Sequence, residues 1–168
     1  NTYEALTAPQ TVAAGKQFIP NMGLDKIFFL LPSKGKFLQN FAQNDQLKAQ
    51  ADQVWRQLDG FSPVLLTVTA VLGIGLAIYY YTGYNEMPGR HYKIKHWGLW
   101  AAIAFILSLV GTAVIEYVGI KTNIKTGLTS LYWLCALNNA LYCFILYLLS
   151  SLVWCNIGRT NAYKFLKF

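Results

Sequence analysis

The chain has 168 residues, of which 55% are hydrophobic and only 12% are charged. A soluble domain carries about 25% charged residues, so this composition argues against an ordinary soluble domain and indicates a surface partly covered by lipid. The net charge of +7 comes mainly from residues 60–168, where basic side chains form short clusters beside long apolar runs; this placement favours anionic lipid headgroups over nucleic acid as the partner.

Residues 1–60 are predicted to form an N-terminal arm that has no core of its own. Residues 1–23 contain two prolines and two glycines without any hydrophobic periodicity, which is typical of extended chain. The apolar run at residues 24–32 is too short to cross a bilayer. We expect this run to lie at the membrane interface or against a partner.

An amphipathic surface helix is predicted over about residues 36–58. Its apolar side chains recur at helical spacing on one face: Leu47, Ala51, Val54, Trp55 and Leu58. The pair Asn44-Asp45 is a candidate break within this helix. The pair Asp59-Gly60 is its expected end, with the glycine at the C-cap and a corner from which the first membrane span rises.

Residues 61–168 are predicted to form a transmembrane domain. Three stretches have the length and apolar composition of membrane-spanning helices, at about residues 62–81, 97–119 and 131–153, and aromatic residues lie at both ends of each. Pro63 falls where a first-turn proline is tolerated, and a basic, aromatic tail follows the third span. The predicted fold class is therefore all-α, a helical integral membrane protein with three transmembrane helices and an N-terminal amphipathic helical arm.

The distribution of lysine and arginine suggests an orientation. Six basic residues lie near the spans in the 82–96 loop and the C-terminal tail, against four on the N-terminal side. The positive-inside rule then places the 82–96 loop and the C-terminus on the matrix or cytoplasmic side. Counting the more distant lysines of the arm reverses this balance. The expected location is an energy-transducing inner membrane, mitochondrial or bacterial.

The loop before the second span contains the first candidate site. Arg90, Lys93 and Lys95 could bind the phosphate of an anionic lipid headgroup, or the same charges could serve only to set the topology. His91 and His96 are five residues apart in this loop, and no cysteine or carboxylate pattern converges on them. We therefore predict no metal site, and no cofactor beyond a possible bound anionic phospholipid.

Polar residues inside the spans form the second candidate site. Glu116 is the only ionisable residue within a span, and intramembrane carboxylates are functional candidates. It lies within one turn of the end of its span, where it could reach the interface or pair with a cation. This position favours a structural contact between helices or subunits over a proton relay. Asn138 and Asn139 lie well inside the third span and are expected to face protein, because a buried amide in lipid needs a partner.

Small residues indicate where helices pack closely. The spacing of Gly98 and Ala102, and the pair Gly73 and Gly75, suggest such contacts. The three cysteines lie too far apart along one helix to pair with each other, and are expected to be packed there as small apolar residues: Cys135, Cys143 and Cys155.

The sequence contains no catalytic motif, no phosphate-binding glycine loop and no nucleophile–base pair. The leading hypothesis is a non-catalytic accessory or scaffolding subunit of a larger membrane complex, whose partners are other membrane subunits and anionic lipids, without nucleic acid or a small-molecule substrate. The alternative is a homo-oligomeric channel or transporter component with a path near Glu116, Asn138 and Asn139. An enzyme or redox-cofactor subunit is a third possibility.

Overall fold

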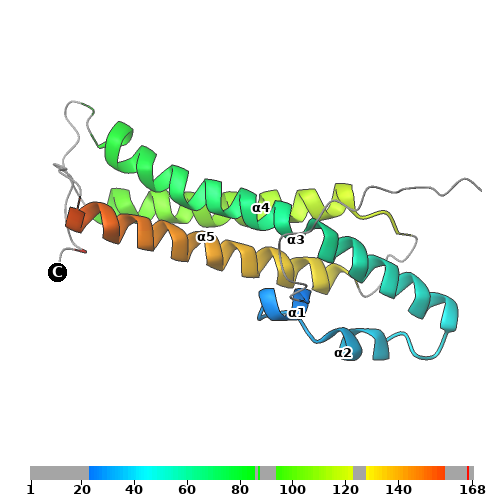
Figure 1. Ribbon diagram of the computed structural model, residues 1–168. Helices are drawn as coiled ribbons and strands as arrows, with labels where there is room; N and C mark the ends of the chain where they lie inside the picture. Colours follow the sequence, from blue (N-terminus) through cyan, green and yellow to red (C-terminus); the bar gives the residue numbers. More distant parts are fainter. Residues whose placement is uncertain (1–22, 86, 88–93, 123–127, 158–165, 167–168) are drawn as a thin grey trace, which may run out of the picture.

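The computed structural model describes residues 23–85, 87, 94–122, 128–157 and 166, and every regular element within these residues is helical. Two short helices precede three long ones (Figure 1). The elements are α1 (Leu24–Ile27), α2 (Lys34–Gln39), α3 (Asp45–Tyr79) with the π-helical turn η1 (Tyr80–Tyr84), α4 (Ile94–Gly119) and α5 (Thr129–Ile157). The predicted all-α class is confirmed.

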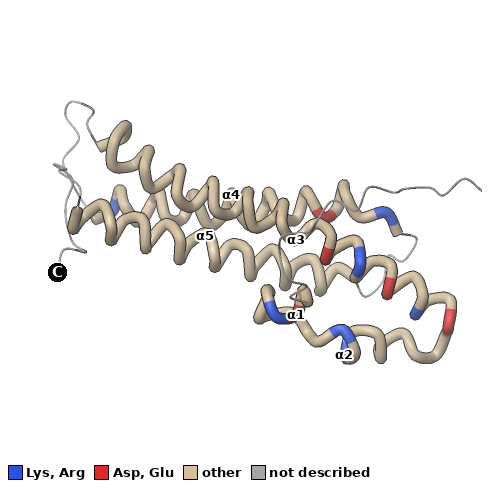
Figure 2. The backbone as a smooth tube through the Cα atoms, in the orientation of Figure 1, with Lys and Arg blue, Asp and Glu red and all other residues tan. Residues whose placement is uncertain are grey.

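The three long helices contain the three predicted spans, and each is long and apolar enough to cross a bilayer. Charged residues gather at the end of the bundle that carries the arm, while most of the length of α3, α4 and α5 is uncharged (Figure 2). The chain is therefore an integral membrane protein.

Helix α3 begins at the predicted break. The Asn44 side chain accepts hydrogen bonds from the backbone amides of Gln46 and Leu47, at 2.9 and 3.4 Å. This is the N-cap arrangement that satisfies the first free amides of a helix. The preceding turn separates α2 from α3, so the expected helix over residues 36–58 is two helices.

The predicted end at Asp59-Gly60 is wrong, because α3 continues through both residues into the first span. Pro63 therefore lies in the helix interior, where it cannot donate to the carbonyl of Asp59 four residues earlier. The hydroxyl of Ser62 donates to that carbonyl at 2.7 Å and replaces the missing bond. The predicted surface helix and the first span thus form one rod without a corner.

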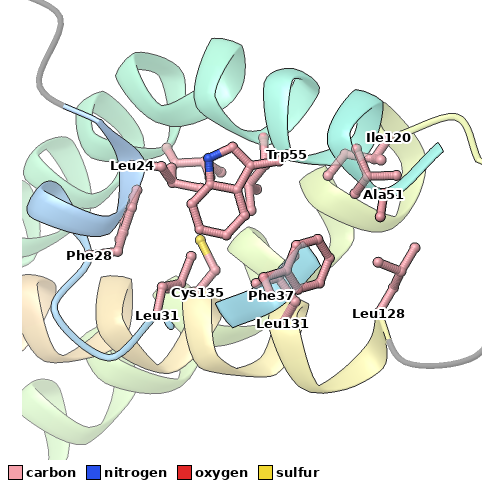
Figure 3. Packing of buried hydrophobic residues seen from close by; sticks show 13 residues of the cluster. Leu24, Phe28, Leu31, Phe37, Ala51, Trp55, Ile120, Leu128, Leu131 and Cys135 are labelled. Carbon is pink, nitrogen blue, oxygen red and sulfur yellow. The ribbon is translucent and has the colours of Figure 1, made fainter. Parts of the chain in front are cut away.

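The arm folds back on the helices of its own chain. Side chains from α1, α2 and the turn between them share one buried cluster with the first part of α3 and with α5 (Figure 3). In the apolar face predicted on α3, Leu47 is 40% exposed and the other four residues are buried. An ion pair from Lys34 to Asp52, at 2.7 Å, joins α2 to α3 at the surface.

The three long helices pack in a constant register. Contacts between α3 and α4 follow an antiparallel order: Gln57 with Lys121, Phe61 with Gly119, Tyr79 with Trp100, and Tyr84 with His96. Helix α5 runs parallel to α3, because Gly73 faces Cys143 and Tyr81 faces Cys155. This register puts Thr69 of α3 level with Thr112 of α4.

Gly73 lies at a close contact between α3 and α5. A Cβ atom at this position would lie 2.8 Å from the carbonyl oxygen of Cys143, whereas one at Gly75 would meet nothing within 4 Å. Of the predicted pair Gly73 and Gly75, only Gly73 lies at a helix contact.

We expect Gly73→Ala to destabilise the bundle by about 1–3 kcal/mol, because backbone atoms of α5 must move to admit the methyl group. Gly75→Ala, the matched control, should be neutral or stabilising by up to about 1 kcal/mol through helix propensity. Thermal unfolding of the two variants in the same mild detergent measures the difference. Equal stability of both variants would contradict the close contact at Gly73.

Candidate functional site

The predicted intramembrane residues Glu116, Asn138 and Asn139 all have 0% exposed surface. Two of them belong to a polar row between α4 and α5. On α4, a buried residue occurs at every fourth position over Ala104, Ser108, Thr112 and Glu116. On α5 the facing row has the same spacing: Cys135, Asn139, Cys143 and Tyr147. Because residues four apart lie on one helix face, the two rows meet along the interface.

Hydrogen bonds join these rows at several levels. The side-chain amide of Asn139 donates to the Thr112 hydroxyl at 3.1 Å. The thiol of Cys143 donates to the Ala104 carbonyl at 3.4 Å. Near the far end of the bundle, the Trp97 indole donates to the Ser151 hydroxyl at 3.0 Å. The row is therefore a polar seam within an otherwise apolar interface, and small side chains let the two backbones approach.

Asn138 points away from this seam and binds the arm. Its side-chain oxygen accepts a hydrogen bond from the backbone amide of Leu30, at 3.3 Å. One turn further along α5, the Tyr142 hydroxyl donates to the backbone carbonyl of Ile27. The Phe28 and Phe29 rings lie 6.4 and 6.0 Å from the Tyr142 ring. The two adjacent asparagines thus hold different partners, α4 for Asn139 and the arm for Asn138.

Glu116 is fully buried, and no cation among the residues that the structure describes pairs with it. Both carboxyl oxygens are buried and lack a hydrogen-bond partner among the residues that the structure describes. Lys121 is exposed, and its backbone is held by the Gln57 side chain at 3.0 and 3.4 Å. The polar neighbours of Glu116 are on α5, namely the Cys135 thiol and the Tyr132 hydroxyl.

The lipid-headgroup site is described only in part. Lys95 lies in the first turn of α4 and is exposed, whereas Arg90 and Lys93 lie outside the described residues. His91 also lies outside them, and the His96 ring packs edge-on against Tyr84 at 5.6 Å. Within the described part of the chain, no group of three His, Cys, Asp or Glu side chains could hold a metal ion. The lipid site stays a prediction.

Gly98 and Ala102 do not lie at a contact between the chain's own helices. Both are exposed on α4, and they line an open apolar groove of about 500 Å³ between α4 and α5 together with aromatic and aliphatic side chains. The close α4–α5 contact is made by Ser108 and Thr112 instead. Their signal in the sequence is the four-residue repeat from Ala104 to Glu116, which marks one face of a helix.

The chain matches no protein-family model, no curated protein and no solved structure. Its function therefore has to be inferred from the seam, the arm and their position in the membrane.

The hydrogen bond between Thr112 and Asn139 can be measured with a double-mutant cycle. We expect Thr112→Val and Asn139→Leu to be coupled by about 0.6–1.7 kcal/mol in unfolding free energy, the range for hydrogen bonds between membrane helices. Thr67→Val is the control, because the exposed Thr67 hydroxyl bonds only the Pro63 carbonyl of its own helix. Coupling of Asn139 to Thr67 as strong as to Thr112 would contradict the seam.

Proposed function

We propose that this protein is a non-catalytic accessory or scaffolding subunit of a larger membrane complex, and that its arm is covered by another subunit. The observation that carries this proposal is the depth at which the arm lies along α5. The depth follows from the position of Asn138 in its span. The charges on α1 then indicate whether lipid or protein surrounds the arm at that depth.

The arm contacts α5 inside the hydrophobic layer. Asn138 lies seven residues into the predicted span 131–153, and it binds the backbone of Leu30. At 1.5 Å per residue, this contact is roughly 10 Å below the start of the span, within a hydrocarbon layer of about 30 Å. The register between α3 and α5 supports the same depth. Asp59 is the charged residue of α3 closest to the level of Asn138, and it lies about seven residues from that level toward the membrane surface.

The outer side of the arm is unsuited to lipid. Lys26 is exposed on α1, Asp25 is half-buried beside it, and Phe29 is 59% exposed in the turn that follows. A charged side chain at the bilayer centre costs about 2.5–3.5 kcal/mol or more. Non-helical backbone is tolerated at membrane depth only where protein or a water-filled cavity surrounds it. A neighbouring subunit over α1 and its following turn meets both requirements.

The remaining parts of the molecule have supporting roles in this proposal. The groove lined by Gly98 and Ala102 offers α4 a surface on which a partner helix could pack closely. The basic residues around the 82–96 loop would bind anionic lipids on the matrix or cytoplasmic side of an energy-transducing inner membrane, where headgroup charge is negative.

Site-specific photo-crosslinking in native membranes tests the proposal. A photoreactive residue replacing Lys26 should attach to a different protein chain that also copurifies with the protein in mild detergent. The same residue replacing Val71, which is 66% exposed on the uncharged second half of α3, is the control and should attach mainly to lipid.

The remaining outcomes separate the alternatives. Crosslinking of position 26 to a second copy of this chain, with a homo-oligomeric native mass, would replace the accessory role with the homo-oligomeric channel hypothesis. Crosslinking of both positions to lipid alone, with a monomeric native mass, would contradict both functions.

A further inference from the structure

Four oxygen atoms with no hydrogen-bond partner in the described structure lie in one layer of the bundle. This layer begins at Glu116 and extends by about one helical turn. The four atoms are the two carboxyl oxygens of Glu116, the hydroxyl of Thr69 and the side-chain oxygen of Asn139. The parent residues are 0%, 1% and 0% exposed. Thr69 comes from α3, Glu116 from α4 and Asn139 from α5, so all three long helices contribute to this layer.

The contacts between the helices fix how these groups lie in space. Asn139 donates to Thr112 at 3.1 Å, and Thr112 is one helical turn from Glu116 on the same buried face of α4. Side chains one turn apart lie about 5–6 Å from each other. The register places Thr69 level with Thr112. With Glu116 ionised, the two carboxyl oxygens and the Asn139 oxygen can only accept hydrogen bonds, whereas the Thr69 hydroxyl can also donate.

In the part of the chain that the structure describes, no fixed positive charge balances this acid. The ion pairs in the described part of the chain link Asp52 with Lys34 and with Arg56, and neither includes Glu116. From α5, the groups that face Glu116 are Cys135 and Tyr132, and α3 contributes Leu65 and Thr69 at this level. The other charged groups that the structure describes at this end include Asp25, Lys26, Asp59 and Lys121, and none of them forms an ion pair with Glu116.

We propose that Glu116 is an intramembrane proton-binding site, which holds its proton at neutral pH, where an exposed glutamate is ionised. An unpaired carboxylate in a dry interior costs far more than a neutral acid. Protonation removes the charge and gives the layer a donor. The Thr112–Asn139 pair extends the site toward the middle of the membrane and leaves the Asn139 oxygen as the next free acceptor.

Infrared spectroscopy of the full chain in lipid nanodiscs tests this directly. At neutral pH, the wild-type protein should show the carbonyl stretching band of a protonated carboxylic acid, and Glu116→Gln should abolish it. Asp59→Asn is the matched control, because Asp59 is exposed, and should leave the band unchanged. Thr112→Val should shift the band, since it changes the polar surroundings of the acid.

Three results would overturn the proposal. The first is a wild-type spectrum at neutral pH without the band, and the second is a band that survives Glu116→Gln. The third is a band that is present when choline is the only cation of the buffer and disappears when sodium ions replace it. The last result would identify a metal cation as the ligand of the carboxylate.

A chemical test keeps the proposal falsifiable even if Glu116→Gln does not fold. A lipid-soluble carbodiimide reacts with a protonated acid: the carboxyl oxygen bonds to the central carbon of the reagent, one nitrogen takes the proton, and the adduct rearranges to a stable acylurea without a leaving group. Mass spectrometry of the wild-type protein should find this adduct on Glu116 and not on Asp59, with a yield that falls as the pH is raised. Absence of the adduct on Glu116 at every pH would contradict the proposal.

Discussion

The close contact of α4 and α5 along a row of small side chains is the interaction on which the rest of the bundle depends. Lipid offers no hydrophobic gain for bringing two apolar helices together, so packing and interhelical hydrogen bonds must supply the attraction. The four-residue repeat that ends at Glu116 brings the backbones near enough for Asn139 to reach Thr112 and for Cys143 to reach the Ala104 carbonyl. Helix α3 then packs over this pair through Gly73.

The sequence predicts the three spans well, because an apolar run of about 20 residues with almost no charge has the length that a bilayer requires and lacks the polar face of a soluble helix. The local signals are less reliable. Asn44 begins α3 as its side chain suggests, but Asp59-Gly60 does not end it, because the hydroxyl of Ser62 supplies the hydrogen bond that Pro63 cannot. A C-cap glycine therefore suggests the end of a helix, although here the Ser62 hydroxyl satisfies the Asp59 carbonyl and the helix continues.

Contacts between distant residues set the limits of prediction at the candidate site. The polarity of Asn138 and Asn139 indicates that they need partners, but the pattern cannot tell that Asn138 binds the arm while Asn139 binds α4. Glu116 is close to the end of its span in the sequence, which suggests solvent or a lysine as its neighbour. Its burial depends on the rotation of α4 toward α5, and Ser108 and Thr112 set that rotation. A single small polar residue in the sequence does not predict which face of a helix is buried.

The arm and Glu116 lie on two sides of the same stretch of α5. Leu24 and Phe28 of the arm belong to the same buried cluster as Cys135, and Cys135 is also a polar neighbour of Glu116. The arm thus covers the outer side of the helix whose inner side faces the acid. A dry environment is what favours the neutral form of a carboxyl group, so the packed arm favours the protonated form of Glu116 by keeping water and the charged groups of the membrane surface away from this side of α5. If a partner subunit holds the arm in place, assembly of the complex and retention of the proton by Glu116 stabilise each other, because each equilibrium shifts with the other.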